Sequence, residues 1–176
     1  MKGMVFTEFF SLVETAFGED MLDDIIDDAN LPNGGAYTAV GTYNHMELVA
    51  MVIALSTRSE IPVPDLVKTF GTYLFGRFVA LYPNFFDNVT DSFVFLSGIE
   101  NIIHAEVLKL YPDANLPKFD VQIEGDELVM IYHSNRHFAD LAEGLIIGAS
   151  QHFDEDFKIV KADLDENSTE FRIVRQ

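Results

Sequence analysis

The sequence contains no cysteine and no tryptophan, and only 11 of its 176 residues are lysine or arginine. Without cysteine, the chain forms no disulfide, offers no thiolate to iron and cannot build a cysteine-based zinc site. The 29 acidic residues give a formal net charge of −18. This charge argues against nucleic acid, because phosphate binding needs clustered cations, and against anionic membranes. We therefore expect neither nucleic acid nor a membrane as partner.

Long hydrophobic runs are also missing. The longest run, near residues 48–55, is far too short to span a bilayer. The N-terminus has a single Lys before an apolar run that Glu8 and Glu14 interrupt, which is unlike a signal peptide. A hydrophobic fraction of 48% over 176 residues is typical of one globular domain with a substantial core. We expect a cytoplasmic protein.

Helical periodicity dominates the first part of the chain, and strands cluster near its end. This order favours an α+β fold with an antiparallel sheet. A row of aspartates within residues 19–29 reads as a solvated helix face. The apolar spacing predicts helices over 4–17, 19–29, 44–56, 65–81, 93–111 and 138–153, strands over 119–123, 127–133, 157–163 and 170–175, and a possible extended piece over 37–43.

One histidine lies beside an apolar stripe in the helix predicted over 93–111. His104 is next to Ile103 and one turn from Val107. An imidazole that faces a core needs a hydrogen-bond partner or a metal, because an unsatisfied buried polar group costs about 1–3 kcal/mol. His104 is therefore a candidate metal ligand. The plainer alternative is a core histidine with a protein partner.

A second candidate is the pattern Tyr132-x-Ser134-x-Arg136, which follows an apolar strand. Strand side chains alternate between faces, so we expect these three to point the same way over roughly 13 Å. Two hydroxyls and a guanidinium suit an anion with several oxygens, and Arg can bind a carboxylate through two hydrogen bonds. With so few cations in the chain, Arg136 is the candidate for holding a dianionic cofactor. The alternative is an exposed polar strand face.

Taken together, these features resemble the H-NOX domain, the haem–nitric oxide/oxygen binding module of soluble guanylate cyclases and bacterial gas sensors. The resemblance covers nearly the whole chain. It implies one domain over 1–176, with a helical distal part over about 1–60, a proximal part with the sheet over 61–176, and haem b (iron protoporphyrin IX) between them. It rests on the opening Met1-Lys2-Gly3, His104, Pro117, Tyr132-x-Ser134-x-Arg136 and the run Gly144-Leu145-Ile146-x-Gly148.

The resemblance also implies roles for the site residues. His104 would be the proximal iron ligand, and Pro117 would press against the porphyrin and help to distort it. The haem propionates would be held by Tyr132, Ser134 and Arg136. Weakening of the iron–His104 bond would then move the His104 helix and transmit the signal. By resemblance, the receiving protein would be a histidine kinase or a cyclic-di-GMP enzyme (diguanylate cyclase or phosphodiesterase).

Gas selectivity follows from the distal residues that the resemblance implies, which are Phe9, Leu74 and Leu141. None of them carries a hydrogen-bond donor, and bound O₂ is held much better when a donor reaches it. Family members that hold O₂ have a tyrosine where Leu141 stands. We therefore predict a sensor that binds NO, with CO as a second candidate ligand, and excludes O₂. Tyr73, beside Leu74, is the donor best placed to make the protein an O₂ sensor instead.

Two other classes of function compete with gas sensing. A haem peroxidase needs a distal acid–base, and the apolar distal residues argue against one, so we do not expect an enzyme. The other class is a cofactor-free acidic interaction module. In such a module His104 is a core residue, and Tyr132, Ser134 and Arg136 lie on the surface.

Overall fold

The computed structural model describes residues 1–176, which form two compact units, Met1–Phe70 and Gly71–Gln176. The units divide inside helix α4 (Val63–Leu81). The division expected from the sequence lay near residue 60, just before this helix. No helix combines the length and the apolarity that crossing a bilayer requires.

The first unit contains helices α1 (Gly3–Phe17), α2 (Glu19–Ala29) and α3 (His45–Ser59), as the periodicity predicted. Asn44 caps α3 by accepting the Met46 N–H at 3.0 Å. The extended piece expected over 37–43 does not become a strand. Only an isolated bridge between Lys2 and Thr42 forms there. The core of the unit consists of apolar side chains that are at most 1% exposed, namely Phe6, Phe9, Val13, Ile25 and Met51.

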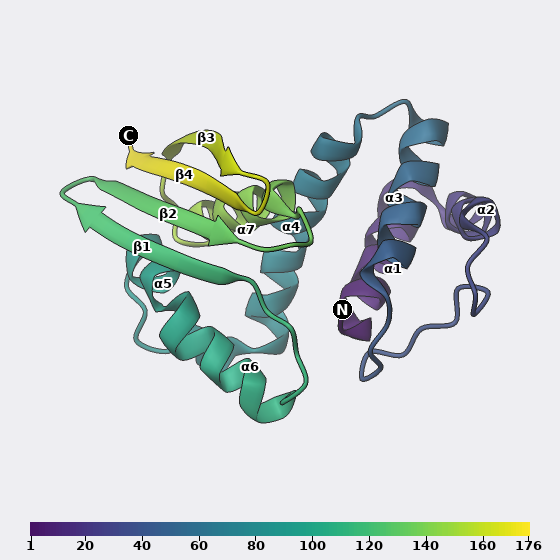
Figure 1. Ribbon diagram of the computed structural model, residues 1–176, viewed down its shortest axis with the longest axis horizontal. Helices are drawn as coiled ribbons and strands as arrows, with labels where there is room; N and C mark the ends of the chain where they lie inside the picture. Colours follow the sequence, from purple (N-terminus) through teal and green to yellow (C-terminus); the bar gives the residue numbers. More distant parts are fainter. The chain divides into compact units, whose positions relative to one another are not determined.

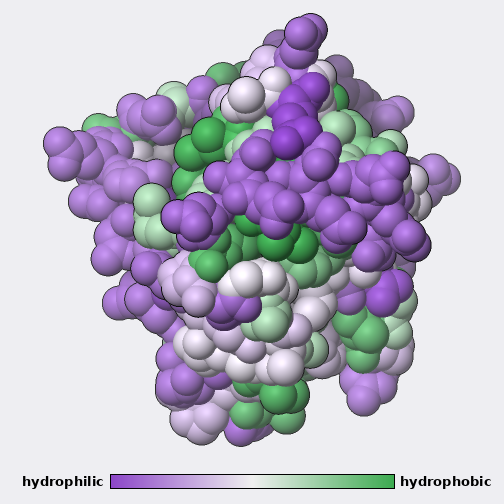
Figure 2. All heavy atoms as spheres, turned by 90° about the vertical axis from the view of Figure 1, so that its right-hand side faces the viewer, coloured by the Kyte–Doolittle hydropathy of each residue, from purple (hydrophilic) through white to green (hydrophobic).

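The acidic row of α2 lies on its outer face, which confirms the prediction of a solvated surface. Figure 2 looks onto the side of the molecule that carries α2 and shows hydrophilic side chains gathered across it. Arg58 of α3 reaches this row and pairs with Asp24 at 2.5 Å and Asp28 at 2.6 Å. Leu22 and Ile25 are buried on the inner face of α2, so the helix is amphipathic, with its aspartates in solvent and its apolar side chains in the core.

The second unit is built on a four-stranded antiparallel sheet with strand order β1-β2-β4-β3 (Figure 1). This sheet confirms the α+β class. The first two strands form a hairpin whose turn uses Gly125 at φ 62°, a conformation that glycine adopts without strain. The strands are β1 (Lys118–Glu124), β2 (Glu127–His133), β3 (Phe157–Asp165) and β4 (Ser168–Arg175).

Helices cover one face of this sheet. Alternate residues of β2 and β4 are buried, as the two-residue period of a strand requires. They share a core with α5 (Ser92–Gly98), α7 (Ala139–His152) and the second half of α4. A short 3₁₀ helix, η1 (Pro83–Phe86), connects α4 to α5. The sheet face thus supports the helices that lead into and out of the candidate site.

The helix predicted over 93–111 is not one regular helix. After α5, a π-helical segment, η2 (Ile99–Ile103), precedes α6 (His104–Leu110). The His104 N–H bonds to the carbonyl of Ile99, five residues back, instead of four. The extra residue in this turn breaks the predicted apolar stripe. Leu96 before the segment is 2% exposed, whereas Leu110 after it is 61% exposed.

Candidate functional site

The imidazole of His104 is largely buried at the point where the π-helical segment meets α6. Its side chain is 13% exposed. Its Nδ1 lies 3.3 Å from Oε2 of Glu100, one turn earlier, but this contact is not aligned as a hydrogen bond, and no other group satisfies Nδ1. Because Nδ1 faces Glu100, the other ring nitrogen, Nε2, is the one left for a ligand.

Glu100 also ties His104 to the sheet. The same oxygen, Oε2, accepts the backbone N–H of Phe119 at 3.1 Å. The Phe119 ring lies between His104 and Tyr132, with ring centroids 5.8 Å and 5.6 Å away. Pro117 directly precedes β1, so the loop that carries it is anchored beside His104. The structure thus brings His104, Pro117 and Tyr132 close together.

Burial sets the protonation state of His104. Desolvation lowers the pKa of its imidazole, and the nearby Glu100 carboxylate works in the opposite direction without cancelling the effect. The ring is therefore neutral at pH 7. A neutral imidazole has a lone pair on one nitrogen, which is the form that binds metals.

Tyr132, Ser134 and Arg136 are held together by a turn and not by a strand. β2 ends at His133, as predicted, so the strand alternation from which we expected all three side chains to point the same way does not extend to Ser134 and Arg136. The Ser134 N–H then donates to the Asn167 carbonyl at 2.9 Å, and the Arg136 N–H donates to Ser134 Oγ at 3.2 Å. Because of this turn, the Ser134 hydroxyl hydrogen-bonds with both the Arg136 backbone and the Tyr132 side chain.

The Tyr132 side chain is 5% exposed at the inner end of this group. Burial raises the pKa of its phenol, and hydrogen bonds with Ser134 and the Phe138 backbone and the charge of Arg136 oppose the increase. The phenol therefore stays protonated at neutral pH and can donate a hydrogen bond. The charge of Arg136 acts on this donor hydroxyl, and a guanidinium with a hydroxyl donor suits the binding of a carboxylate.

Arg136 has no ion pair, unlike the two arginines of β4, Arg172 and Arg175. Arg172 pairs with Glu170 at 2.9 Å and Glu127 at 3.2 Å, and Arg175 pairs with Asp91 at 2.6 Å. Arg136 is not among the ion-paired residues. In a protein with net charge −18, an unpaired guanidinium is available for an anion that the chain itself does not supply.

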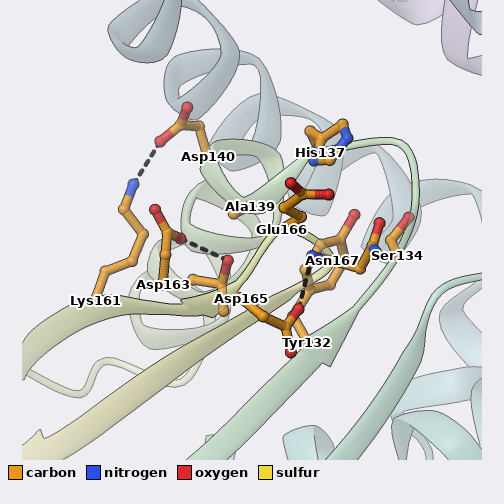
Figure 3. Close-up of a pocket in the computed structure, with 11 residues that line it drawn as sticks. Tyr132, Ser134, His137, Ala139, Asp140, Lys161, Asp163, Asp165, Glu166 and Asn167 are labelled. Atoms are coloured by element: carbon orange, nitrogen blue, oxygen red, sulfur yellow. Dashed lines mark hydrogen bonds and ion pairs between the residues drawn. The ribbon is translucent and has the colours of Figure 1, made fainter.

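A cavity of about 280 Å³ adjoins this group (Figure 3). Tyr132 and Ser134 line it together with three acidic residues of the β3–β4 hairpin, Asp163, Asp165 and Glu166. Its lysine, Lys161, is already paired with Asp140 at 2.5 Å. Such a lining repels carboxylates. Arg136, which does not line this cavity, is the better candidate for holding an anionic ligand.

The three predicted distal residues lie on three different helices. Phe9 of α1 is 1% exposed and packs edge-on against Phe70, with ring centroids 5.4 Å apart. Leu74 of α4 is 2% exposed, and Leu141 of α7 is half-buried. A Cβ at Gly71 would lie 2.4 Å from the Leu141 carbonyl oxygen, so α4 and α7 approach closely near Leu141. None of the three side chains carries a donor.

Reasoning from the sequence missed Glu100 and Phe119. Glu100 stands four residues before His104, and the i, i+4 spacing of a helix could have identified it as a neighbour of the imidazole. Phe119 could not be found in this way, because its contacts depend on how β1 packs against the π-helical segment.

The residues present fit a metal only as part of a cofactor. Nowhere in residues 1–176 do three or more His, Asp or Glu side chains gather as a metal site. A lone buried imidazole holds a metal firmly when another group supplies the remaining ligands, as a tetrapyrrole does. The buried Nδ1 of His104, with a carboxylate beside it, is the arrangement that a metal-ligating imidazole requires.

Comparison with known proteins agrees with this chemistry. Residues 2–161 match the family described as Haem-NO-binding. The H-NOX protein from Shewanella woodyi, solved in the Fe(II)CO state, is 40% identical with a TM-score of 0.87, covering 100% of this chain and 95% of that one. The Fe(II) unliganded H-NOX protein from K. algicida is 35% identical with a TM-score of 0.94, covering 100% and 97%.

A third solved structure is the H-NOX protein from S. oneidensis in the Fe(II)NO state. It is 28% identical with a TM-score of 0.93, and the match covers 100% of this chain and 99% of that one. No curated protein matched the chain.

Proposed function

The protein belongs to the haem-NO-binding (H-NOX) family, and from that premise we propose that it is a haem-based sensor that binds nitric oxide at ferrous iron and excludes dioxygen. The observation that carries the haem assignment is the buried, neutral His104, whose Nδ1 faces Glu100 and whose Nε2 is left for the iron. We propose haem b as the cofactor; a chain without cysteine cannot form the thioether bonds of a c-type haem.

Each remaining residue of the site has a distinct task in this proposal. Arg136 offers its unpaired guanidinium to the haem propionates, and Tyr132 and Ser134 add hydroxyl donors beside it. Pro117, just before β1, would contact the porphyrin. The acidic surface of the chain makes the Arg136 cation important, because the many carboxylates would otherwise repel the propionates.

Selectivity for NO comes from the missing distal donors. Ferrous haem, when bound, supplies an iron that takes NO strongly and O₂ only with help from a hydrogen-bond donor. Phe9, Leu74 and Leu141 offer no donor. Two relatives, the H-NOX proteins from S. oneidensis and Shewanella woodyi, were solved in the Fe(II)NO and Fe(II)CO states, which supports both gases as ligands here.

The signal would leave the site through the helix that carries His104. The π-helical turn before His104 makes this helix less regular than its neighbours, and such turns are frequent at functional sites. His104 would shift when its bond to the iron weakens, and α6 would move with it. By resemblance, we infer that a histidine kinase or a cyclic-di-GMP enzyme receives the signal.

Absorption spectroscopy tests the proposal directly. The purified protein, reduced without oxygen, is expected to show a Soret band that shifts on addition of NO and stays unchanged in air. A stable change of the spectrum in air would instead indicate an O₂-binding protein with a distal donor, for which Tyr73 is the first candidate. Absence of a Soret band after haem is supplied would leave the cofactor-free interaction module.

A substitution at Leu141 tests the distal assignment. Leu141→Tyr adds a donor worth about 1–3 kcal/mol, which would strengthen O₂ binding roughly 5- to 150-fold. The measurement is an O₂ titration of the ferrous protein. The control is Leu141→Phe, which adds the ring without the hydroxyl and is expected to exclude O₂ as the wild type does. Equal O₂ binding by both variants would show that Leu141 is not at the distal face.

A further inference from the structure

We propose that Glu100 is a positioning residue for the iron ligand: its carboxylate accepts the Nδ1–H of His104 and so sets how strongly Nε2 holds the iron. The inference rests on the proposed role of His104 as that ligand. Glu100 would touch neither the haem nor the gas. It would act only through the imidazole.

The geometry already places Glu100 for this task. Its Oε2 lies 3.3 Å from His104 Nδ1, and Nδ1 is buried with no aligned partner. At this distance, rotation of the imidazole would bring its N–H into line with this oxygen. An acceptor at Nδ1 fixes the tautomer that keeps the Nε2 lone pair free, as metal-bound histidines require.

Glu100 is itself held from the other side. Its Oε2 accepts the Phe119 N–H at 3.1 Å, so a single oxygen receives a strand amide and faces the imidazole. The backbone of β1 therefore fixes the carboxylate instead of leaving it free to rotate. β1 begins directly after Pro117. The bond between the Phe119 N–H and Glu100 therefore anchors both residues predicted on the proximal side, His104 and Pro117.

The strength of the effect follows from the charge on that oxygen. A carboxylate that accepts the Nδ1–H pushes electron density into the ring and strengthens the bond from Nε2 to a metal. Two features limit this gain: the Phe119 N–H draws on the same oxygen, and the Glu100 side chain is 39% exposed to water. We therefore expect Glu100 to give an iron–His104 bond of intermediate strength, which suits a sensor whose signal depends on weakening of that bond.

The same helix provides a matched control. Glu106 has the same charge and lies two residues after His104, but its carboxylate pairs with Lys109 at 2.5 Å. Glu106→Gln therefore removes one negative charge near His104 without touching its Nδ1. A general electrostatic effect of charge on the iron would appear in both Glu100 and Glu106 variants.

The test compares Glu100→Gln, Glu100→Leu and Glu106→Gln with the wild type. Resonance Raman spectra of the ferrous unliganded proteins give the iron–histidine stretching frequency, haem transfer to apomyoglobin gives the rate of haem loss, and urea unfolding of the apo-proteins gives stability. We expect Glu100→Leu to lower the frequency and to speed haem loss roughly 10- to 100-fold. Glu100→Gln is expected to shift both in the same direction by less, and Glu106→Gln to leave both unchanged.

The outcomes separate cleanly. An unchanged stretching frequency in the Glu100 variants would overturn the proposal, even if apo-stability falls, because that combination means Glu100 only anchors Phe119. If Glu100→Leu does not fold, Glu100→Gln decides, since its amide oxygen still accepts the Phe119 N–H. A wild type with haem but no iron–histidine band would instead overturn the His104 assignment, and this inference with it.

Discussion

Arg136 is the residue whose surroundings say most about its use, because it has no ion pair in a protein of net charge −18. We expect Arg136→Ala to speed haem loss roughly 10- to 100-fold, since hydrogen bonds to charged groups contribute about 1.5–3 kcal/mol. Haem transfer to apomyoglobin measures the rate. The control is Arg172→Ala, which removes the same charge from an arginine paired with Glu170 and Glu127. Equal rates for the two variants would contradict a propionate contact at Arg136.

Asp91 shows how one side chain can stabilise the start of the helix that leads to His104. Its Oδ1 accepts the Val94 N–H at 3.1 Å and pairs with Arg175 at 2.6 Å. Partial burial works to raise the pKa of Asp91, but the Val94 N–H, Thr90 and Arg175 outweigh it, and the pKa is lowered. A carboxyl whose folded pKa is lowered stabilises the fold above its ordinary pKa, near 3.8, and loses that contribution as the pH falls through the folded value.

Asp91→Ala is therefore expected to cost about 1 kcal/mol of unfolding free energy at pH 7, as loss of a helix cap does. The cost should shrink as the pH falls below 4, where the wild-type carboxyl becomes protonated. Urea unfolding of the wild type and the variant at pH 7 and below pH 4 measures the difference in unfolding free energy. Asp91→Asn keeps a capping oxygen and loses the charge, so it isolates the part that Arg175 contributes. A cost for Asp91→Ala that does not change with pH would mean that the charge is irrelevant.

At the scale of elements, close contact between α4 and α7 depends on glycine. A Cβ at Gly148 would lie 2.5 Å from Cβ of Phe75 and 3.1 Å from the Thr72 carbonyl oxygen. Thr72 also donates to the Gly144 carbonyl at 3.1 Å. We expect Gly148→Ala to destabilise the protein by about 1–3 kcal/mol, because the helices must separate. Thermal or urea unfolding measures the change.

Gly76, on the same α4, gives the opposite expectation. It is exposed, and nothing lies within 4 Å of an added Cβ. Gly76→Ala should stabilise the protein by about 0.5–1 kcal/mol, because alanine loses less backbone entropy in a helix. If both substitutions stabilise, the close approach of α4 and α7 is not required. If both substitutions destabilise the protein, the effect does not depend on how closely the neighbouring helix approaches the glycine.

The π-helical segment is the element that differs most from the one predicted. Apolar spacing over 93–111 predicted a regular helix, yet the turn at Ile99–Ile103 contains one residue too many. No local pattern indicates such a turn, because its hydrogen bonds depend on how the segment packs against α5 and β1. Its result is that His104 faces Glu100 and Phe119, while Leu110 lies in solvent.

At the scale of the whole molecule, charge is the dominant feature. A net charge of −18 and an isoelectric point near 4.3 mean that the folded chain repels itself at neutral pH. We expect the melting temperature at pH 7.5 to rise with sodium chloride and to level off once the screening length falls to about 8 Å near 0.15 M. Calorimetry in a salt series measures it.

The same series at pH 5.5 serves as the control, because the smaller net charge should give a smaller rise. A melting temperature that falls with salt would show that ion pairs such as Arg58–Asp24 stabilise the fold by more than the general repulsion destabilises it.

The sequence by itself determined the element order, the α+β class, the acidic outer face of α2 and the candidate residues His104, Tyr132, Ser134 and Arg136. These follow from periodicity and spacing, which are local properties. Only the tertiary structure decided that β2 ends before Ser134, that a π-helical turn precedes His104, and that Glu100 and Phe119 surround its ring. The reason is physical: a turn or a contact partner is chosen by packing between segments far apart in the chain, and no single window of sequence contains both partners.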